Sequence, residues 1–278
     1  MRIKKVTLHG VGPFEHQEIE FREGKNPDLA DVTLLVGENG TGKSTILYGI
    51  ATAVGGREPN EASQLLQERK RPPGDGHAGV EFEDREQLVR VITQNVFAMP
   101  TKSWAAFAYA GIRQLENIRV KGIEEQEGEP LSGALAFTSG DAGNRFAQWL
   151  ALANYRRREA SATGSAKAAR FHQAIARVEG ALSEMFGEPI SFAFPFDRDP
   201  TPRVEMRGES LNLNDLPDGV KSILSWVGDL FMRHDRLEWV NDLPIEQREF
   251  LLLLDEIDVH LHPAWQRRVL PLAQRLFP

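Results

Sequence analysis

Hydrophobic positions recur along the chain with two different periods, and together they predict an α/β protein. Val32 to Val36 and Phe250 to Leu254 are short apolar runs of the kind found in buried strands. Other short or alternating apolar runs predict strands at 3–8, 17–21, 80–82, 88–93, 190–196 and 203–206. A stretch rich in proline, glycine and charge at 57–79 is predicted to be a surface excursion.

Helical spacing, with apolar residues every three or four positions, appears between these strands. It predicts helices at 44–54, 222–232 and 264–277 and two helices within 144–185. Small residues at 161–165 separate the last two and predict a helical hairpin. The Gly- and Glu-rich stretch 120–143 is expected to be mobile. We therefore expect an N-terminal lobe at 1–143, the hairpin at 144–186 and a C-terminal lobe at 187–278.

Composition narrows the class of protein only slightly. The 278 residues suffice for one large α/β domain or two small ones, and 41% hydrophobic with 26% charged residues is ordinary for a soluble globular protein. Neither a membrane span nor an apolar signal core is present, so a cytoplasmic protein is expected. The absence of cysteine excludes disulfides and thiolate metal sites. A net charge of −7 argues against a wholly basic nucleic-acid coat but not against a local basic face.

The first apolar run leads into a glycine-rich loop at a strand-to-helix junction. The loop consists of Gly37, Glu38, Asn39, Gly40, Thr41, Gly42, Lys43, Ser44 and Thr45. It matches the phosphate-loop pattern, in which glycines let several N–H groups converge on an anion at a helix N-terminus. Lys43 is predicted to reach the β- and γ-phosphates of ATP, and the Ser44 hydroxyl to bind Mg²⁺.

Two carboxylates follow the second apolar run directly. In open α/β sheets, ligands bind outside the carboxyl ends of the strands. Asp255 is therefore predicted to hold Mg²⁺ through water. Glu256 is predicted to orient or deprotonate the water that attacks the nucleotide.

Three segments together resemble a known family: the loop 37–45, Leu-Pro-Asp-Gly-Val-Lys at 216–221, and Leu-Asp-Glu-Ile-Asp-Val-His-Leu-His-Pro at 254–263. They resemble ABC-type ATPases of the SMC and RecF kind, and more narrowly the OLD-like and PtuA-like ATPases of prokaryotic anti-phage defence. The resemblance implies a P-loop NTPase fold with a mixed central sheet flanked by helices, an inserted antiparallel β lobe and a helical hairpin. It also implies ATP and Mg²⁺ as ligands and a head-to-tail homodimer with two ATP molecules at its interface.

The resemblance assigns the middle segment to the signature, which binds the γ-phosphate held by the other subunit. Pro217 and Asp218 replace the family's serine and first glycine, whereas Gly219 keeps the close backbone approach and Lys221 can supply positive charge. An ordinary Pro-Asp-Gly turn is the alternative. The family's glutamine loop matches Gln114, which would complete the Mg²⁺ and water shell, with Gln94 as the alternative.

Smaller assignments stay open. Phe14 can stack on an adenine or pack in the core. His260 and His262 can bind a metal or lie at a subunit interface. Arg69-Lys70-Arg71 and Arg156-Arg157-Arg158 can contact DNA phosphates or form solvated faces.

The family continues past the carboxylate strand with a strand carrying a Thr-His-Ser switch, but this sequence stops at Pro278. It is therefore expected to be a fragment or to hydrolyse ATP poorly, with any nuclease on a separate polypeptide. The leading hypothesis is a dimerising ATPase that acts as sensor or regulatory subunit of a DNA-directed complex. The alternatives are a nucleotide-dependent scaffold with little hydrolysis and a DNA-binding recombination or repair ATPase.

Overall fold

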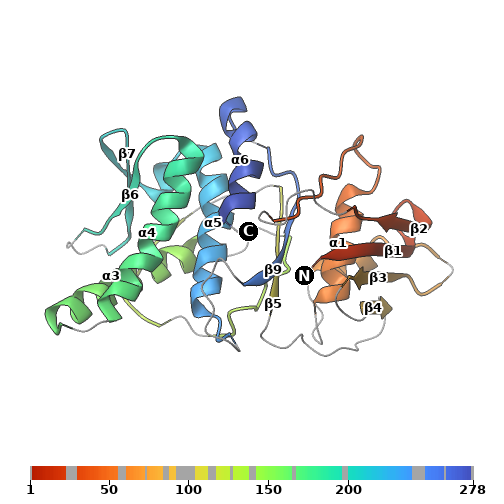
Figure 1. The fold of residues 1–278 in the computed structure, drawn as a ribbon, viewed down its shortest axis with the longest axis horizontal. Coiled ribbons are helices and arrows are strands. Elements are labelled where there is room, and N and C mark those ends of the chain that lie inside the picture. The colour runs from red at the N-terminus through yellow and green to blue at the C-terminus, as the bar shows by residue number, and fades with distance from the viewer. Residues whose placement is uncertain are drawn as a thin grey trace.

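The computed structural model has three parts along its long axis (Figure 1). It describes residues 2–22, 30–55, 61–72, 74–83, 88–91, 104–111, 117–125, 128–137, 142–164, 167–195, 200–239, 248–259 and 261–276. An antiparallel sheet lies at one end, a parallel strand pair in the middle, and a helical region at the other end.

The N-terminal sheet has four antiparallel strands in the order β2-β1-β3-β4. They are β1 (Ile3–Val11), β2 (Phe14–Glu20), β3 (His77–Phe82) and β4 (Leu88–Val91). The helix α1 (Lys43–Val54) packs against β1 and β3, and the helix α2 (Glu61–Gln67) packs against α1. Gly49 lets α1 approach the sheet, because a Cβ there would lie 2.4 Å from Leu8 Cδ2. The strands predicted at 3–8, 17–21 and 80–82 are confirmed, as is the described part of the strand predicted at 88–93. Helix α2 lies inside the stretch that was predicted to be a surface excursion.

Two parallel strands, β5 (Trp104–Tyr109) and β9 (Glu249–Leu254), connect the two ends of the molecule. The protein has an N-terminal core between the antiparallel sheet and α1, and a C-terminal core among the helices of the second half. Alternate residues of each strand pack in one core or the other. Trp104 and Ala106 pack in the N-terminal core, and Phe107 packs in the C-terminal core. The pair is thus covered on both faces, as parallel sheets usually are. Its register pairs Tyr109 with Leu254, so the chain leaves β9 at Asp255 beside the end of β5.

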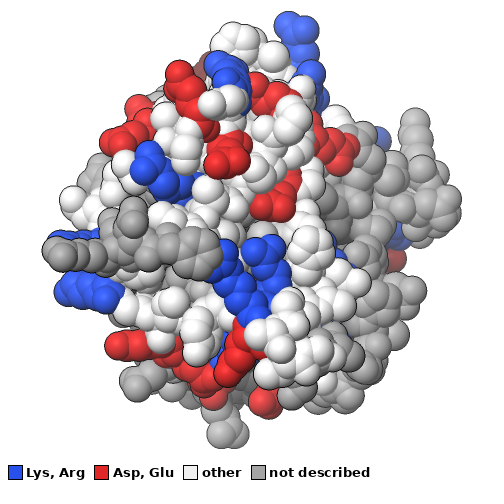
Figure 2. Space-filling model, turned by 90° about the vertical axis from the view of Figure 1, so that its left-hand side faces the viewer, with Lys and Arg blue, Asp and Glu red and all other residues white. Residues whose placement is uncertain are grey.

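The C-terminal region is mainly helical. It contains α3 (Ala142–Ala162), α4 (Lys167–Phe186), β6 (Ile190–Ala193), β7 (Arg203–Met206), β8 (Glu209–Asn212), the 3₁₀ helix Leu213–Asp215, α5 (Asp218–Arg236) and α6 (Pro263–Leu276). The predicted hairpin is confirmed as α3 and α4, and β8 is an addition. Phe146, Leu182 and Trp226 are fully buried between the helices. At the hairpin end, Lys and Arg side chains are interspersed with Asp and Glu (Figure 2). No described helix is long and apolar enough to span a membrane.

Residues 32–36, predicted to be a buried strand, belong to no strand of the structure. Val32, Leu34 and Val36 are 42%, 61% and 83% exposed. Strands are held by backbone pairing with a neighbour, and no strand of the described chain pairs with this segment. The prediction of a buried strand here is therefore wrong for this structure.

The expectation of mobility for 120–143 also needs correction in its described part. Val120, Ala134 and Phe137 are buried. The Ala108 N–H donates a hydrogen bond of 2.7 Å to the Ala134 carbonyl, which fastens this stretch to β5. The glycine-rich composition of this stretch gave no indication that its apolar residues are buried.

His234 gives the fold a defined sensitivity to acid. The imidazole is 6% exposed and its ring centroid lies 4.8 Å from that of Trp239. Burial, together with the positive charges of Arg248 and Arg177, lowers the pKa of His234 from 6.5 to about 3. The folded protein therefore keeps this side chain neutral in mild acid, whereas the unfolded chain protonates it.

We expect the free energy of unfolding to fall as pH drops from 6.5 towards 3, by about 1.4 kcal/mol per pH unit from this group. His234→Phe should keep the ring stacking and flatten the decrease, as measured by urea denaturation across that window. His172→Gln, which replaces an exposed imidazole on α4, is the control. Equal pH slopes for wild type and His234→Phe would contradict the assignment.

Candidate nucleotide site

The glycine-rich loop enters the first turn of α1 through two left-handed glycines. Gly40 has φ +82° and Gly42 has φ +100°, values that side chains disfavour. Gly42 is the N-cap of α1 and makes no side-chain hydrogen bond, so no cap side chain occupies the N–H groups of the first turn. A Cβ on Gly42 would lie 2.5 Å from Phe14 Cζ, so the position has no room for a side chain. This packing agrees with the core alternative for Phe14.

Lys43 folds its ammonium group back over the loop. Its Nζ donates hydrogen bonds to the carbonyls of Gly37 at 2.7 Å and Glu38 at 2.8 Å. Residues 37–41 are exposed to solvent, so the loop is accessible. A positive charge beside uncapped helix N–H groups on an open surface suits a triphosphate. The residues present therefore fit a nucleotide, with the Ser44 hydroxyl in the same helical turn.

The carboxylate pair lies on a tight turn after β9. The Asp255 N–H donates a hydrogen bond of 3.0 Å to the Tyr109 carbonyl at the end of β5. Glu256 has φ +45°, a left-handed conformation that is uncommon for a residue with a side chain. Gly111 lies against Glu256, since a Cβ on Gly111 would be 2.5 Å from Glu256 Oε2. The Glu256 side chain is exposed, as a residue acting on water must be.

The loop helix and the carboxylates lie on neighbouring elements. α1 packs against both β5 and β9. Burial raises the pKa of the Tyr48 hydroxyl on α1, the Arg69 guanidinium opposes this, and the charges of Asp255 and Glu256 raise the pKa further. The two carboxylates are therefore close enough to α1 to act on it electrostatically. Segments far apart in sequence thus lie on neighbouring elements here, and their role as one nucleotide site stays a prediction.

Arg69 joins this region although sequence reasoning placed it among candidate DNA contacts. Its Nη1 donates a hydrogen bond of 2.9 Å to Thr45 Oγ1, and its Cζ lies 4.7 Å from the centre of the Tyr48 ring. Its carbonyl accepts a 2.7 Å hydrogen bond from the Gly12 N–H. Arg69 thus brings a positive charge to the first turns of α1. Its position in a Pro- and Gly-rich stretch gave no signal of this contact.

The signature-like segment starts α5. Pro217 is the N-cap, and its carbonyl accepts hydrogen bonds from the N–H groups of Val220 and Lys221 at 2.9 and 3.0 Å. Asp218 is exposed, Gly219 buried and Lys221 half-buried. Val220 packs in the C-terminal core, whereas the residues of α1 pack in the N-terminal core. A role of Asp218, Gly219 and Lys221 at another subunit's nucleotide stays a prediction.

Several predicted residues cannot be placed. Gln94, Gln114 and His260 lie outside the described residues. His262 is described: its Nδ1 accepts a 3.2 Å hydrogen bond from the Ala264 N–H at the start of α6, and its ring contacts Trp265. This gives His262 a structural role at the helix start.

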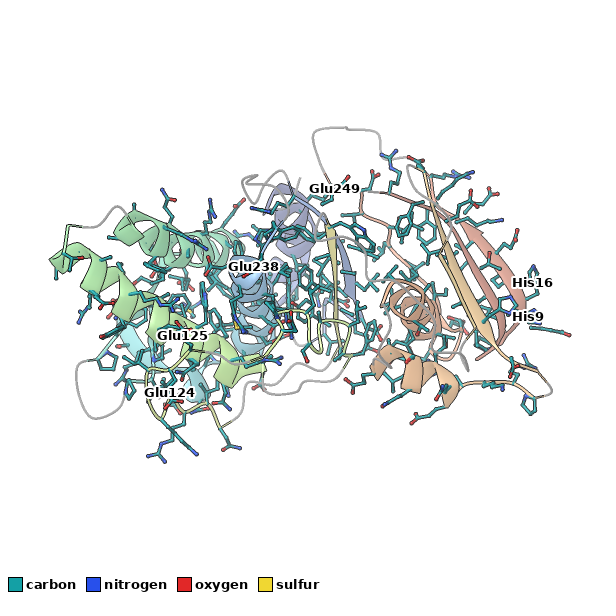
Figure 3. The ribbon with its side chains drawn as sticks, turned by 90° about the horizontal axis from the view of Figure 1, so that it is seen from below. His9, His16, Glu124, Glu125, Glu238 and Glu249 are labelled. Atoms are coloured by element: carbon teal, nitrogen blue, oxygen red, sulfur yellow. The ribbon has the colours of Figure 1, made fainter. Side chains whose placement is uncertain are left out.

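No group of three or more His or acidic side chains in the described chain is arranged to hold a metal. His9 and His16 are ring neighbours, 5.8 Å apart, but lie at the far end of the N-terminal sheet, away from β9 (Figure 3). A Mg²⁺ site of the predicted kind needs no such group, because phosphates and water supply most ligands.

A glycine-rich loop that opens α1, beside a strand that ends in paired carboxylates, is the arrangement expected of a P-loop ATPase of the ABC type. A family model described as an AAA domain matches residues 5–126. Septu protein PtuA of Bacillus mycoides (strain KBAB4) is 23% identical over 289 residues, covering 99% of this chain and 36% of the relative. The Retron Ec83 probable ATPase of Escherichia coli is 34% identical over 74 residues, 27% of this chain and 14% of the relative.

The Retron Vc95 probable ATPase of Vibrio cholerae serotype O1 biovar El Tor is 30% identical over 82 residues, 28% of this chain and 16% of the relative. Among solved structures, the Smc head domain of Pyrococcus furiosus with an extended coiled coil, bound to the C-terminal domain of ScpA, is similar with a TM-score of 0.47 and 15% identity. The match covers 99% of this chain and 86% of that one.

These comparisons bear out the predicted resemblance: part of the chain matches an AAA domain model, and the chain is similar to Septu protein PtuA and to two retron probable ATPases. The mixed α/β architecture agrees with the predicted fold class. The chain spans about a third of the PtuA relative, 36%, and smaller shares of the retron relatives. What those longer proteins do as a whole comes to this chain only as a proposal.

Proposed function

We propose that the chain binds ATP with Mg²⁺ and hydrolyses it to ADP and phosphate. The observation that carries the proposal is the packing of the phosphate-loop helix α1 against β9, the strand that delivers Asp255 and Glu256. Lys43 and the loop N–H groups would hold the β- and γ-phosphates. Ser44, Asp255 and Gln114 would complete the Mg²⁺ shell.

The proposed residues have two roles: some stabilise negative charge on the phosphates, and one accepts a proton. Lys43 and the first-turn N–H groups offset the charge that develops on the phosphate oxygens as the β–γ bridge breaks. Glu256 orients the attacking water and accepts its proton, which then passes to solvent. Arg69, held on α1 by Thr45, adds positive charge to the same region. All of the residues proposed for the site except Gln114 lie in the part of the chain that the structure describes.

The second part of the proposal is a head-to-tail homodimer. Asp218, Gly219 and Lys221 form the first turn of α5, where Pro217 provides no side-chain cap. The N-terminus of this helix is thus suited to an anion, with Lys221 adding charge that offsets Asp218. ATP bound to one subunit would be contacted by this turn of the other, so that binding closes the dimer and hydrolysis opens it.

The third part concerns the partner. We propose a sensor or regulatory role towards a separate effector, of which a DNA-directed nuclease is the kind that the family resemblance favours. The basic run on α3 gives little support to direct DNA binding. Arg156 pairs with Glu125 and lies over the Phe171 ring, and Arg157 bonds Asn154 Oδ1 at 2.7 Å. These guanidinium groups are already engaged within the chain.

Lys43→Ala should weaken ATP and ADP binding by about ten- to a hundred-fold, because it removes a charge-assisted contact to phosphate. Calorimetric titration of the nucleotide measures this. Lys121→Ala removes an exposed lysine and should leave affinity unchanged. Equal affinities for wild type and Lys43→Ala would refute the phosphate-loop assignment.

Mixing the Lys43→Ala variant with a Lys221→Ala variant tests the head-to-tail arrangement. Lys43→Ala and Lys221→Ala should each be nearly inactive alone, since both nucleotide sites of each such homodimer carry one defect. In the mixed dimer, one nucleotide site combines both defects and the other has none. Phosphate release should therefore recover on mixing, up to about half of the wild-type rate per mixed dimer. Failure to recover would argue against sites shared between subunits.

A further inference from the structure

Tyr109, the last residue of β5, contacts two parts of the molecule that the proposed reaction must coordinate. Its backbone carbonyl accepts the 3.0 Å hydrogen bond from the Asp255 N–H. Its hydroxyl donates a 2.9 Å hydrogen bond to Asp229 Oδ2 on α5. One residue thus connects the carboxylate turn to the helix that starts with the signature-like segment.

Asp229 is a firmly held anchor for this hydroxyl. Arg233 Nε donates a 2.6 Å hydrogen bond to the same Oδ2, and both side chains are 3% exposed. Arg145 Nη2 lies 3.8 Å from Oδ1. Arg233 Nη1 also donates to the carbonyls of Pro130 and Ser132 at 2.6 and 2.8 Å. Charged hydrogen bonds away from water are strong and narrow in geometry, so the position of Asp229 fixes that of the tyrosine hydroxyl.

The end of β5 in turn fixes both carboxylates. Beyond Tyr109, the Gly111 backbone is packed so closely against Glu256 that a Cβ on the glycine would lie 2.7 Å from Glu256 Cβ. Asp255 is held through its N–H and Glu256 through this contact. A small displacement of β5 must therefore move the group proposed to act on water.

In the scheme proposed below, α5 would supply the displacement. Its backbone hydrogen bonds make it a stiff rod from Asp218 to Arg236. A contact made by its first turn would therefore reach Asp229 in the middle of the helix as a shift of the whole helix. The Tyr109 hydroxyl is the point where that shift enters the strand leading to the carboxylates.

We propose that the Tyr109–Asp229 hydrogen bond is a positioning link through which the first turn of α5 sets the geometry of the Asp255–Glu256 turn. The inference rests on the proposed ATPase function and deepens it. Tyr109 is a positioning residue in this scheme. It acts through Asp255 and Glu256, and the hydrogen bond makes hydrolysis depend on what occupies the N-terminus of α5.

Tyr109→Phe tests the link because it removes the hydroxyl and keeps the ring. We expect kcat to fall by about ten- to a hundred-fold at saturating ATP and at protein concentrations that saturate dimerisation. The affinity for ATP should be unchanged, since the loop and α1 are untouched. Tyr155→Phe makes the same chemical change at an exposed position on α3 and should match wild type in both measurements.

A double-mutant cycle separates positioning from general loss of packing. Lys221→Ala alters the first turn of α5, so its effect on kcat should be smaller in the Tyr109→Phe background than in wild type. Effects that simply multiply would overturn the link. Asp229→Asn should reproduce the loss of kcat with unchanged ATP affinity, and it takes the place of Tyr109→Phe if that variant folds poorly.

Two outcomes distinguish this inference from the function on which it rests. If Tyr109→Phe keeps wild-type kcat while Glu256→Gln abolishes hydrolysis, the link is wrong and the ATPase assignment stands. If wild type and Glu256→Gln release phosphate equally, the ATPase assignment falls and the link falls with it.

Discussion

Glu256→Gln should lower the rate of phosphate release by about a hundred-fold or more while ATP still binds. The amide keeps the size of the side chain but cannot accept the proton of the attacking water. Because the loop and Lys43 are unchanged, ATP should accumulate in the site, and the proposed dimer should persist. Sedimentation with ATP and Mg²⁺ should show a dimer for this variant that disappears with ADP.

The control for this substitution lies on the same strand. Glu249→Gln makes the identical chemical change at the start of β9, at the end opposite the proposed site (Figure 3). It should leave hydrolysis and assembly as in wild type. Phosphate release that does not differ between wild type and Glu256→Gln would favour a nucleotide-dependent scaffold. A variant that stays monomeric with ATP would count against the dimer.

Arg233→Met should destabilise the fold by about 3–5 kcal/mol. It leaves the charge of Asp229 buried without its closest partner, and the Pro130 and Ser132 carbonyls lose a donor. Urea denaturation at neutral pH measures the change. The combined Asp229→Leu and Arg233→Met variant should be more stable than Arg233→Met alone, because it removes the stranded charge.

An arginine on the surface provides the matched control. Arg207 pairs with Glu188 at 3.0 Å but its side chain is 69% exposed. Arg207→Met should leave stability nearly unchanged, because the Arg207 side chain is mostly in water and an exposed ion pair contributes little. Similar destabilisation by the two arginine substitutions would show that burial is not the cause.

Local sequence patterns predicted the helices and strands whose own residues show a clear hydrophobic pattern. Residues 43–54, 142–186 and 249–254 have periodic or continuous apolar positions, and each forms the expected helix or strand. The turn into α1 at Gly40 and Gly42 was also predictable, since glycine spacing reflects local backbone chemistry, whereas the binding of phosphate by the loop 37–45 stays a prediction. These predictions depend on neighbours in sequence.

Features set by tertiary contacts were not predictable. Residues 32–36 have strand composition but no paired neighbour, and Arg69 reaches Thr45 from a stretch that resembled a solvated excursion. The hydrogen bond between Tyr109 and Asp229 joins residues 120 positions apart, and neither residue belongs to a recognisable motif. Pairing and long-range polar contacts depend on the whole fold, which a single sequence does not display.

The shared strand pair has a consequence for how the chain can be divided. β5 comes from the first half of the sequence and β9 from the second, and each strand contributes side chains to both cores. A truncation that removes either strand would remove packing residues from both cores at once. Melting should therefore be cooperative across the described chain, with one transition and no separately folding half.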